Sequence, residues 1–255
     1  MQRAGSRAAW HKRGHMSAIE NLIKKDLKTI NYKVVKEDRI NAKNKDYFYL
    51  SGVQVFCGRQ GMGKTISMVK TVLDIKKRFP KCIVVTNLVL NVDFDYISFQ
   101  SMEELADVLT GINNGIYGVV YAIDEIHTYF NALDSKNIPS YVFTEISQQR
   151  KQRKLILGTS QLYLRLAKPF REQSDTLIQC RCIAHKFNIM YVYDGATLEE
   201  DFGKLKGTLL KVGWFMQTPE LRNSYDTFQK VVSGREEYAA TPQYMLDPKT
   251  SKKRK

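Results

Sequence analysis

Residues 58–65, with the sequence GRQGMGKT, constrain the fold of this 255-residue chain more than any other stretch. They match the pattern G-x-x-x-x-G-K-[S/T], in which glycines let backbone N–H groups wrap a phosphate without obstruction by side chains. A strand-like run, VQVFC, precedes the loop, and a run with helical periodicity, ISMVKTVLDI, follows it. The positive end of that helix would face the same phosphates. The sequence therefore predicts a phosphate-binding loop between a strand and a helix. A glycine-rich turn without a ligand is the alternative.

The loop positions have predicted roles in binding a nucleoside triphosphate. The Lys64 ammonium would reach the β and γ oxygens, and the Thr65 hydroxyl would ligate Mg²⁺. The predicted nucleotide-binding residues are Gly58, Arg59, Gln60, Gly61, Met62, Gly63, Lys64 and Thr65.

An acidic pair, Asp124 and Glu125, ends the apolar run VVYAI. Ligands of open α/β sheets bind at the carboxyl ends of the strands. Asp124 can hold Mg²⁺ there through water, and Glu125 can orient and deprotonate an attacking water. This division of roles favours a hydrolase over a small-molecule kinase, which avoids activating water. Two ordinary loop acids are the alternative.

Polar residues also follow the run LILG, where Thr159, Ser160 and Gln161 end a fourth predicted strand. If this strand lies between the phosphate-loop strand and the Asp124 strand, these side chains face the γ-phosphate and can detect it. Otherwise they form a polar turn. His127, two residues after Glu125, either contacts nucleotide or substrate or is a loop histidine without chemistry.

The run YVFTEISQQRKQRK, residues 141–154, is predicted to be one helix. Arg150 and Arg153 are three residues apart and would share a helical face. One of them could be a catalytic arginine finger for a neighbouring subunit's nucleotide. The pair could instead bind nucleic-acid phosphates or form a solvated basic face. Arg171, in KPFREQ, is a second candidate for the finger.

Strand and helix patterns alternate over residues 50–175, which predicts an α/β fold with a mostly parallel central sheet flanked by helices. The residues SMEE at 101–104 form a predicted capping box for the helix EELADVLTGI. From residue 176 the run TLIQCRCIAHKFNIMYVYDG predicts an antiparallel hairpin, GTLLKVGWFMQ a further strand, and PELRNSYDTFQKVV a closing helix or turn. Upstream, SAIENLIKKDLKTI has the spacing of an amphipathic helix.

Charge and composition narrow the class of protein. The net charge is +14, with +4 in residues 1–16 and +4 in the last ten residues, so the remainder is moderately basic. This is compatible with binding nucleic acid. The KKRK end could contact phosphates or an acidic membrane surface, or could act only as a solubilising tail. The four cysteines form no metal-ligand spacing and fit a reduced, cytosolic protein.

No apolar run reaches the roughly 18 residues that cross a bilayer, and the N-terminus lacks the apolar region of a signal peptide. We therefore expect a cytoplasmic protein. The predicted organisation is a disordered or misassigned start (1–16), an N-terminal extension (17–50), a nucleotide-hydrolysing domain (51–235) and a basic tail (236–255).

Taken together, GRQGMGKT, VVTN, AIDEIH and a basic Q-x-R-K segment followed by ILGTSQ resemble the FtsK–HerA group of P-loop motor ATPases. Within that group the chain is similar to the zonula occludens toxin-like proteins of filamentous phages and to viral DNA-packaging ATPases. The later LRNSYDTF is similar to an S-Y-D-T stretch near the end of such domains. The similarity spans roughly residues 50–230. The loop and the acidic pair occur in many ATPases, whereas Gln161 is more particular to this group.

The resemblance implies a RecA-like P-loop NTPase fold of the additional-strand, catalytic-glutamate (ASCE) type, with ATP and Mg²⁺ as ligands. It implies a homo-oligomeric ring, often a hexamer, that moves DNA or drives virion assembly. By motif position, Lys64 and Thr65 contact phosphates and Mg²⁺, Asp124 holds Mg²⁺, Glu125 activates water and Gln161 is the γ-phosphate sensor. The finger is not placed uniquely.

One feature departs from the phage assembly proteins, which typically carry a transmembrane helix after the ATPase domain. No such segment is found in this sequence, which favours a soluble motor in the host bacterial cytoplasm or one recruited by a membrane partner. The leading hypothesis is an ATP-hydrolysing motor that translocates or packages DNA for a phage or mobile element. The alternatives are an assembly or export ATPase acting on virion proteins and a nucleotide-gated switch or scaffold.

Overall fold

The computed structural model describes residues 44, 46–201 and 204–226. The chain divides into two units, residues 1–47 and 48–255, and every element below belongs to the second unit. The helix predicted near residues 17–30, the predicted start (1–16) and the predicted tail (236–255) lie outside the described residues.

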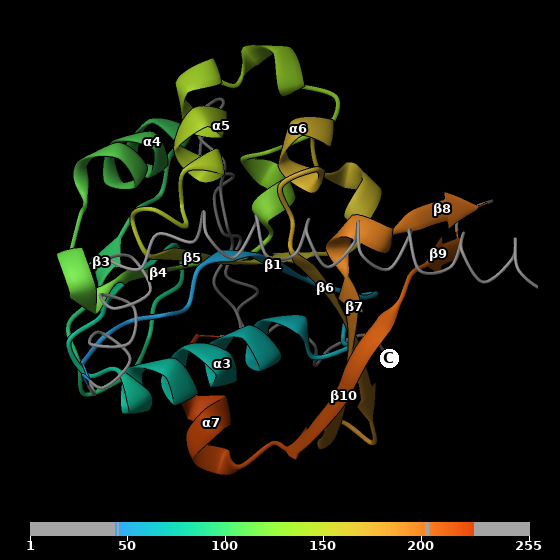
Figure 1. Ribbon diagram of the computed structural model, residues 1–255. Coiled ribbons are helices and arrows are strands. Elements are labelled where there is room, and N and C mark those ends of the chain that lie inside the picture. The colour runs from blue at the N-terminus through green and yellow to red at the C-terminus, as the bar shows by residue number, and fades with distance from the viewer. Residues whose placement is uncertain (1–43, 45, 202–203, 227–255) are drawn as a thin grey trace, which may run out of the picture. The chain divides into compact units, whose positions relative to one another are not determined.

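The unit is built on one eight-stranded sheet with the order β10-β7-β6-β1-β5-β4-β2-β3 (Figure 1). Its strands are β1 (Gly52–Cys57), β2 (Ile83–Thr86), β3 (Ile97–Ser98), β4 (Val119–Ile123), β5 (Lys154–Ser160), β6 (Thr176–Ile183), β7 (Phe187–Asp194) and β10 (Leu209–Met216). The pairings from β6 to β3 are parallel, and β7 and β10 add two antiparallel strands. The short strands β8 (Glu199–Asp201) and β9 (Lys204–Lys206) pair separately.

This arrangement confirms the predicted fold class. The four predicted parallel strands, the hairpin after residue 176 and the strand that follows it are all present. The strand β5 lies between β1 and β4, which was the condition set for the polar residues after LILG to face the phosphates. The short strands β3, β8 and β9 were not predicted, because two or three residues carry too little periodicity.

Helices cover both faces of the sheet. They are α3 (Lys64–Arg78), α4 (Met102–Gly111), α5 (Ser140–Ser147), α6 (Lys168–Arg171) and α7 (Pro219–Asn223). The helices α3 and α7 lie on one face, and α4, α5 and α6 lie on the other (Figure 1).

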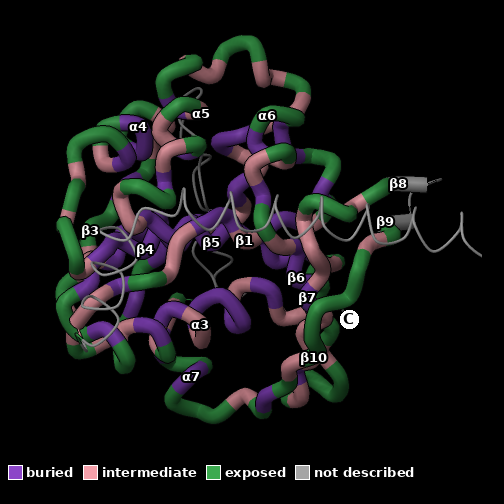
Figure 2. The backbone as a smooth tube through the Cα atoms, in the orientation of Figure 1, coloured by how far each residue is buried: buried purple, intermediate pink, exposed green. Residues whose placement is uncertain are grey.

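The helix α3 packs on the sheet through Met68, Val69, Val72 and Ile75, which recur on one helical face as the sequence pattern predicts. Basic residues fill the last turn of α3, where their positive charge interacts favourably with the negative end of the helix dipole. Figure 2 shows the buried strands sandwiched between the helical layers. The phosphate loop at the start of α3 is thus held by a well-packed element.

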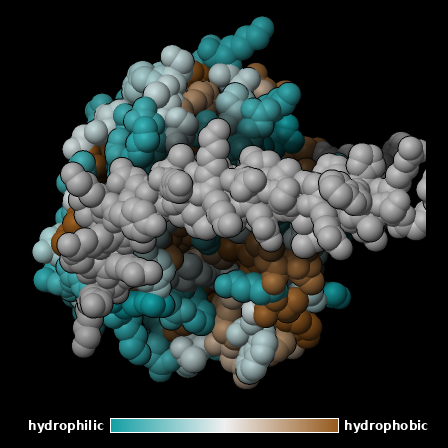
Figure 3. Space-filling model, in the orientation of Figure 1, coloured by the Kyte–Doolittle hydropathy of each residue, from teal (hydrophilic) through white to brown (hydrophobic). Residues whose placement is uncertain are grey.

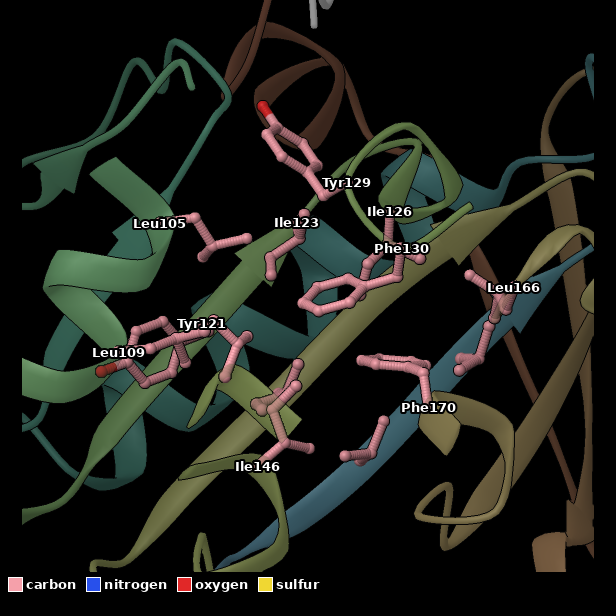
Figure 4. Packing of buried hydrophobic residues seen from close by; sticks show 14 of the residues in the cluster. Leu105, Leu109, Tyr121, Ile123, Ile126, Tyr129, Phe130, Ile146, Leu166 and Phe170 are labelled. Atoms are coloured by element: carbon pink, nitrogen blue, oxygen red, sulfur yellow. The ribbon is translucent and has the colours of Figure 1, made fainter. Parts of the chain in front are cut away.

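The other face holds a second apolar cluster (Figure 4). Phe130 and Phe170 stack there with their ring centroids 4.7 Å apart. The predicted capping box of α4 is present, since Ser101 Oγ accepts from the Glu104 backbone N–H at 3.1 Å. The Glu104 carboxylate reaches back to the N–H of Gln100 at 2.7 Å.

The helix predicted over residues 141–154 is shorter than expected, because α5 ends at Ser147. Turns follow it, and Arg153 takes a left-handed backbone conformation with φ 52°, which redirects the chain into β5 at Lys154. Arg150 and Arg153 therefore do not share a helical face, and that prediction was wrong. Both precede β5, at the edge of the sheet opposite the carboxyl ends of its parallel strands.

The outer strand β10 presents an apolar surface. Val212, Trp214 and Met216 lie on one side of it and are more than half exposed, with Trp214 at 67%. In Figure 3 hydrophobic residues gather on the side where β10 lies. A β-bulge interrupts its pairing with β7 between Leu209 and Lys211.

Two sequence-level expectations concern cysteines and membranes. All four cysteines are free thiols, and Cys57, Cys82 and Cys180 are buried. Within the described ranges, none of the helices has both the length and the apolar character to cross a bilayer.

Candidate functional site

A cavity of about 910 Å³ opens where the carboxyl ends of β4 and β5 meet the start of α3. Its lining falls into two groups. The first comes from the predicted motifs and consists of Gln60, Gly61, Gly63, Lys64, Thr65, Ile66, Asp124, Glu125, His127, Thr128 and Gln161. The second was not predicted and consists of Cys182, His185, Gln217, Arg222 and Tyr225. Three loop residues, Gly58, Arg59 and Met62, line a smaller neighbouring cavity of about 410 Å³ instead.

The phosphate loop has the backbone of an anion-binding site. Gly61 and Gly63 both take φ 75°, in the left-handed region that favours glycine. The helix α3 begins directly after Gly63, without a side-chain cap and without an acidic residue in its first turn. Its first N–H groups are thus available for an anion. Lys64 is buried, with Nζ 3.4 Å from the Arg59 carbonyl oxygen, so its charge is confined to the loop.

Asn188, from β7, holds the loop from the side. It is fully buried, and its Nδ2 donates to Gly63 O at 3.3 Å and to Ser67 Oγ at 3.2 Å. Its Oδ1 accepts from Gln217 Nε2 at 2.7 Å. Sequence reasoning missed this residue because it lies 125 positions from Gly63, and a single asparagine in FNIMYVY carries no motif.

The packing of Asn188 on Gly63 predicts a large difference between two glycine substitutions. In Gly63→Ala the new Cβ would lie 2.2 Å from Asn188 Nδ2, whereas in Gly61→Ala it would meet nothing within 4 Å. Both variants bear the strain of a left-handed alanine, about 1–2 kcal/mol. We therefore expect Gly63→Ala to lose clearly more unfolding free energy than Gly61→Ala in denaturant titrations without nucleotide. Equal losses would contradict the assigned packing.

Asp124 is fixed by three other elements. Its Oδ1 accepts from Thr65 Oγ1 at 2.9 Å and from Thr159 Oγ1 at 2.6 Å. The buried side chain of Asn87, after β2, pairs with the Asp124 backbone, accepting from its N–H at 2.8 Å and donating to its carbonyl at 2.9 Å. In the sequence Asn87 is only the last residue of VVTN. Its role depends on β2 lying beside β4 in the sheet.

The residues at this point fit a Mg²⁺ ion. The Asp124 carboxylate oxygen and the Thr65 hydroxyl oxygen lie 2.9 Å apart. Both are hard oxygen ligands of the kind that Mg²⁺ prefers. No group of three or more histidine, cysteine or acidic side chains suited to a metal occurs among the described residues.

Glu125 is held in an unusual backbone conformation, with φ 47° in the left-handed region. Its N–H donates to Thr159 Oγ1 at 2.9 Å. Burial, followed by the charge of Asp124, raises the pKa of the Glu125 carboxyl above its ordinary value, while Lys64 and a hydrogen bond from Gln161 oppose this rise. The carboxylate is therefore partly desolvated and directed into the cavity.

His127 lies against the same carboxylate. Its Nδ1 is 3.2 Å from Glu125 Oε2, although the two atoms are not aligned for a hydrogen bond. Burial and the positive charges of Arg165 and Lys64 lower the pKa of the His127 imidazole. The structure thus brings His127 to the acidic pair, and sequence reasoning had left its position open.

The end of β5 carries two of its three polar residues into the site. Thr159 bonds Asp124 and the Glu125 backbone, and Gln161 lines the cavity together with Glu125. Ser160 does not face the cavity, because its hydroxyl donates to the Leu162 carbonyl at 2.8 Å.

The predicted arginines are not brought to this cavity. Arg150 and Arg153 precede β5 and so lie at the opposite end of the parallel strands from the cavity. Arg171 lies in α6, with its guanidinium 6.0 Å from the centre of the Tyr163 ring. The cavity is lined instead by Arg222 of α7. Its only sequence signal was its place within LRNSYDTF.

Comparison with known proteins bears on the fold. No family model matches the sequence, and no curated protein matches it. Among solved structures, the chain is similar to the N-terminal domain of zonular occludens toxin from Neisseria meningitidis, at 12% identity and a TM-score of 0.51, over 69% of this chain and 100% of that one. It also matches B204, the DNA-packaging ATPase from Sulfolobus Turreted Icosahedral Virus, at 11% identity and a TM-score of 0.47, over 63% and 98% of the two chains. The predicted resemblance to zonula occludens toxin-like proteins is therefore confirmed at the level of the fold.

Proposed function

We propose that this protein is an ATP hydrolase that uses the cavity above α3 as its nucleotide site. The proposal rests on three hydrogen bonds, each of 2.9 Å or less, that link the residues Thr65, Asp124, Thr159 and Glu125. These bonds connect the phosphate loop with a carboxylate suited to bind a metal and with a candidate base, both at the ends of strands.

Each residue then has a definite task. The loop N–H groups and Lys64 bind the phosphates, and Thr65 with Asp124 would hold Mg²⁺, which would offset the negative charge of the phosphates. Glu125 accepts a proton from the attacking water. Gln161 lines the same cavity as Glu125, and we assign it the detection of the γ-phosphate.

The position of Glu125 favours hydrolysis over the other uses of a phosphate loop. A small-molecule kinase has no need of a base beside the metal carboxylate, because activated water would waste its nucleotide. A switch or scaffold would bind ATP tightly with little turnover. The raised pKa of the Glu125 carboxyl strengthens it as a proton acceptor, which supports turnover.

We further propose that hydrolysis drives the movement or packaging of DNA for a phage or mobile element. The net charge of +14 supports a polyanionic partner bound through its backbone. The motifs shared with FtsK–HerA motors support a homo-oligomeric ring, such as a hexamer, working in the host bacterial cytoplasm with any membrane association made through a partner. In such a ring one of Arg150, Arg153 and Arg171 would act on a neighbour's nucleotide, since none of the three lines the cavity of its own chain.

Phosphate release from ATP, measured with and without single- and double-stranded DNA, tests both parts of the proposal. We expect turnover that DNA stimulates and that added salt suppresses, because backbone contacts release counterions. Turnover indifferent to DNA would contradict the DNA motor and favour an ATPase acting on virion proteins. Tight ATP binding without turnover would contradict hydrolysis and leave a switch.

A further inference from the structure

The five residues that form the unpredicted wall of the cavity, Cys182, His185, Gln217, Arg222 and Tyr225, have no task in the chemistry proposed above. We propose that this wall is the nucleoside subsite, with Arg222 contacting the base and ribose of the bound nucleotide. The inference rests on the proposed function and assigns the part of the ligand that the phosphate machinery does not reach.

The direction of the nucleotide follows from the loop. In a phosphate loop, Lys64 reaches the β and γ oxygens, while the backbone N–H groups also cradle the α phosphate. Asp124, Glu125 and Gln161 mark the γ end of the cavity, because they supply the metal-type carboxylate, the base and the sensor. The sheet order places β6 on the side of β1 opposite β5 and β4, so the α-phosphate end of the nucleotide would lie toward β6. The wall residues, which lie in or follow β6, β10 and α7, line the cavity on that side.

Arg222 is held there in a fixed orientation. Its Nε donates to Gln217 Oε1 at 2.9 Å, and its Nη2 donates to the His185 carbonyl oxygen. These two hydrogen bonds fix the plane of the guanidinium. Its flat face and its remaining N–H donors therefore have a fixed direction as well. A planar guanidinium stacks on rings and donates to acceptors in a fixed fork. Because the loop and Lys64 already hold the phosphates, the base and the ribose are the parts of the ligand left for Arg222.

A hydrogen-bond chain joins this arginine to the phosphate loop. Gln217 accepts from Arg222 and donates through Nε2 to Asn188 Oδ1 at 2.7 Å, and Asn188 donates to Gly63 O at 3.3 Å. Because Gln217 uses its oxygen on one side and its nitrogen on the other, its amide cannot flip without breaking one of the two bonds. The phosphate and nucleoside halves of the site are thus aligned by one set of side chains.

The test compares a non-hydrolysable ATP analogue with inorganic tripolyphosphate, which lacks the nucleoside, each with Mg²⁺. We expect Arg222→Ala in the full-length chain to weaken binding of the analogue by at least about tenfold, in the range of a lost base-stacking contact. Tripolyphosphate affinity should stay unchanged. Arg222→Lys should not restore the analogue, because lysine lacks the planar fork. The control Arg78→Ala changes an exposed arginine at the far end of α3 and should leave both ligands unaffected.

The outcomes separate this inference from the proposed function. Unchanged analogue affinity in Arg222→Ala, or an equal loss for both ligands, would overturn the nucleoside subsite while leaving the phosphate site intact. Failure of the wild-type chain to bind either ligand would overturn the nucleotide site itself. Retained tripolyphosphate binding in Arg222→Ala also shows that the variant is folded.

Discussion

Replacing Glu125 with glutamine is expected to lower the rate of ATP hydrolysis by roughly a hundredfold to ten-thousandfold, the usual worth of a positioned general base. The amide has the shape of the carboxylate but cannot take a proton from water. The Glu125 N–H bond to Thr159 and the left-handed backbone do not depend on the carboxylate, so the loop after β4 should keep its geometry. ATP affinity should therefore be retained.

This result is best measured as phosphate release at saturating ATP, beside equilibrium binding of the same nucleotide. Glu172→Gln is a matched control, because it makes the same chemical change at an exposed glutamate of an i,i+4 pair with Lys168. We expect the control to hydrolyse ATP at the wild-type rate. Turnover in Glu125→Gln within a few-fold of wild type would show that another group activates the water.

The substitution Lys64→Met is expected to act at an earlier step, by weakening ATP binding about tenfold to a hundredfold and removing hydrolysis with it. A charge-assisted hydrogen bond is worth about 1.5–3 kcal/mol, and each 1.4 kcal/mol is about tenfold in Kd. Methionine fills the volume of the lysine stem but donates nothing to phosphate. Because Lys64 is buried as a cation, its removal should not lower the unfolding free energy of the ligand-free protein.

Titration calorimetry and denaturant unfolding give the two readouts. The control Lys77→Met alters an exposed lysine in the last turn of the same helix and should change neither ATP affinity nor turnover. A Lys64→Met variant that binds ATP as tightly as wild type would mean that the loop does not hold the phosphates. Lost binding together with a large loss of stability would instead point to a structural role for Lys64.

The parts of the fold that the sequence predicts are those set by local pattern. The apolar spacing of α3, the Ser101 capping box and the runs that form β1, β4 and β5 are each contained in a dozen residues or fewer. The loop was predicted from its own motif, and the acidic pair from the rule that ligands bind at the carboxyl ends of parallel strands. The strand order had to be assumed for Gln161, since periodicity does not say which strand lies beside which.

The residues that were missed or misplaced depend on contacts between distant segments. Asn188 and Arg222 reach the site from β7 and α7, which fold back across the start of α3. The basic segment after α5 was predicted to continue the helix, yet the chain turns at Arg153 so that Lys154 can enter β5. At this point the path of the chain into the sheet outweighed the local helix propensity.

The surface of β10 has a consequence for how the protein behaves when it is concentrated. Among the described residues β10 pairs only with β7, so its other edge offers backbone groups to any extended chain, next to the exposed indole of Trp214. The bulge between Leu209 and Lys211 bends that edge and shortens the stretch that another strand could follow. A deletion that removed this bulge would extend the regular edge beyond Lys211–Met216, and we expect it to increase self-association at high concentration.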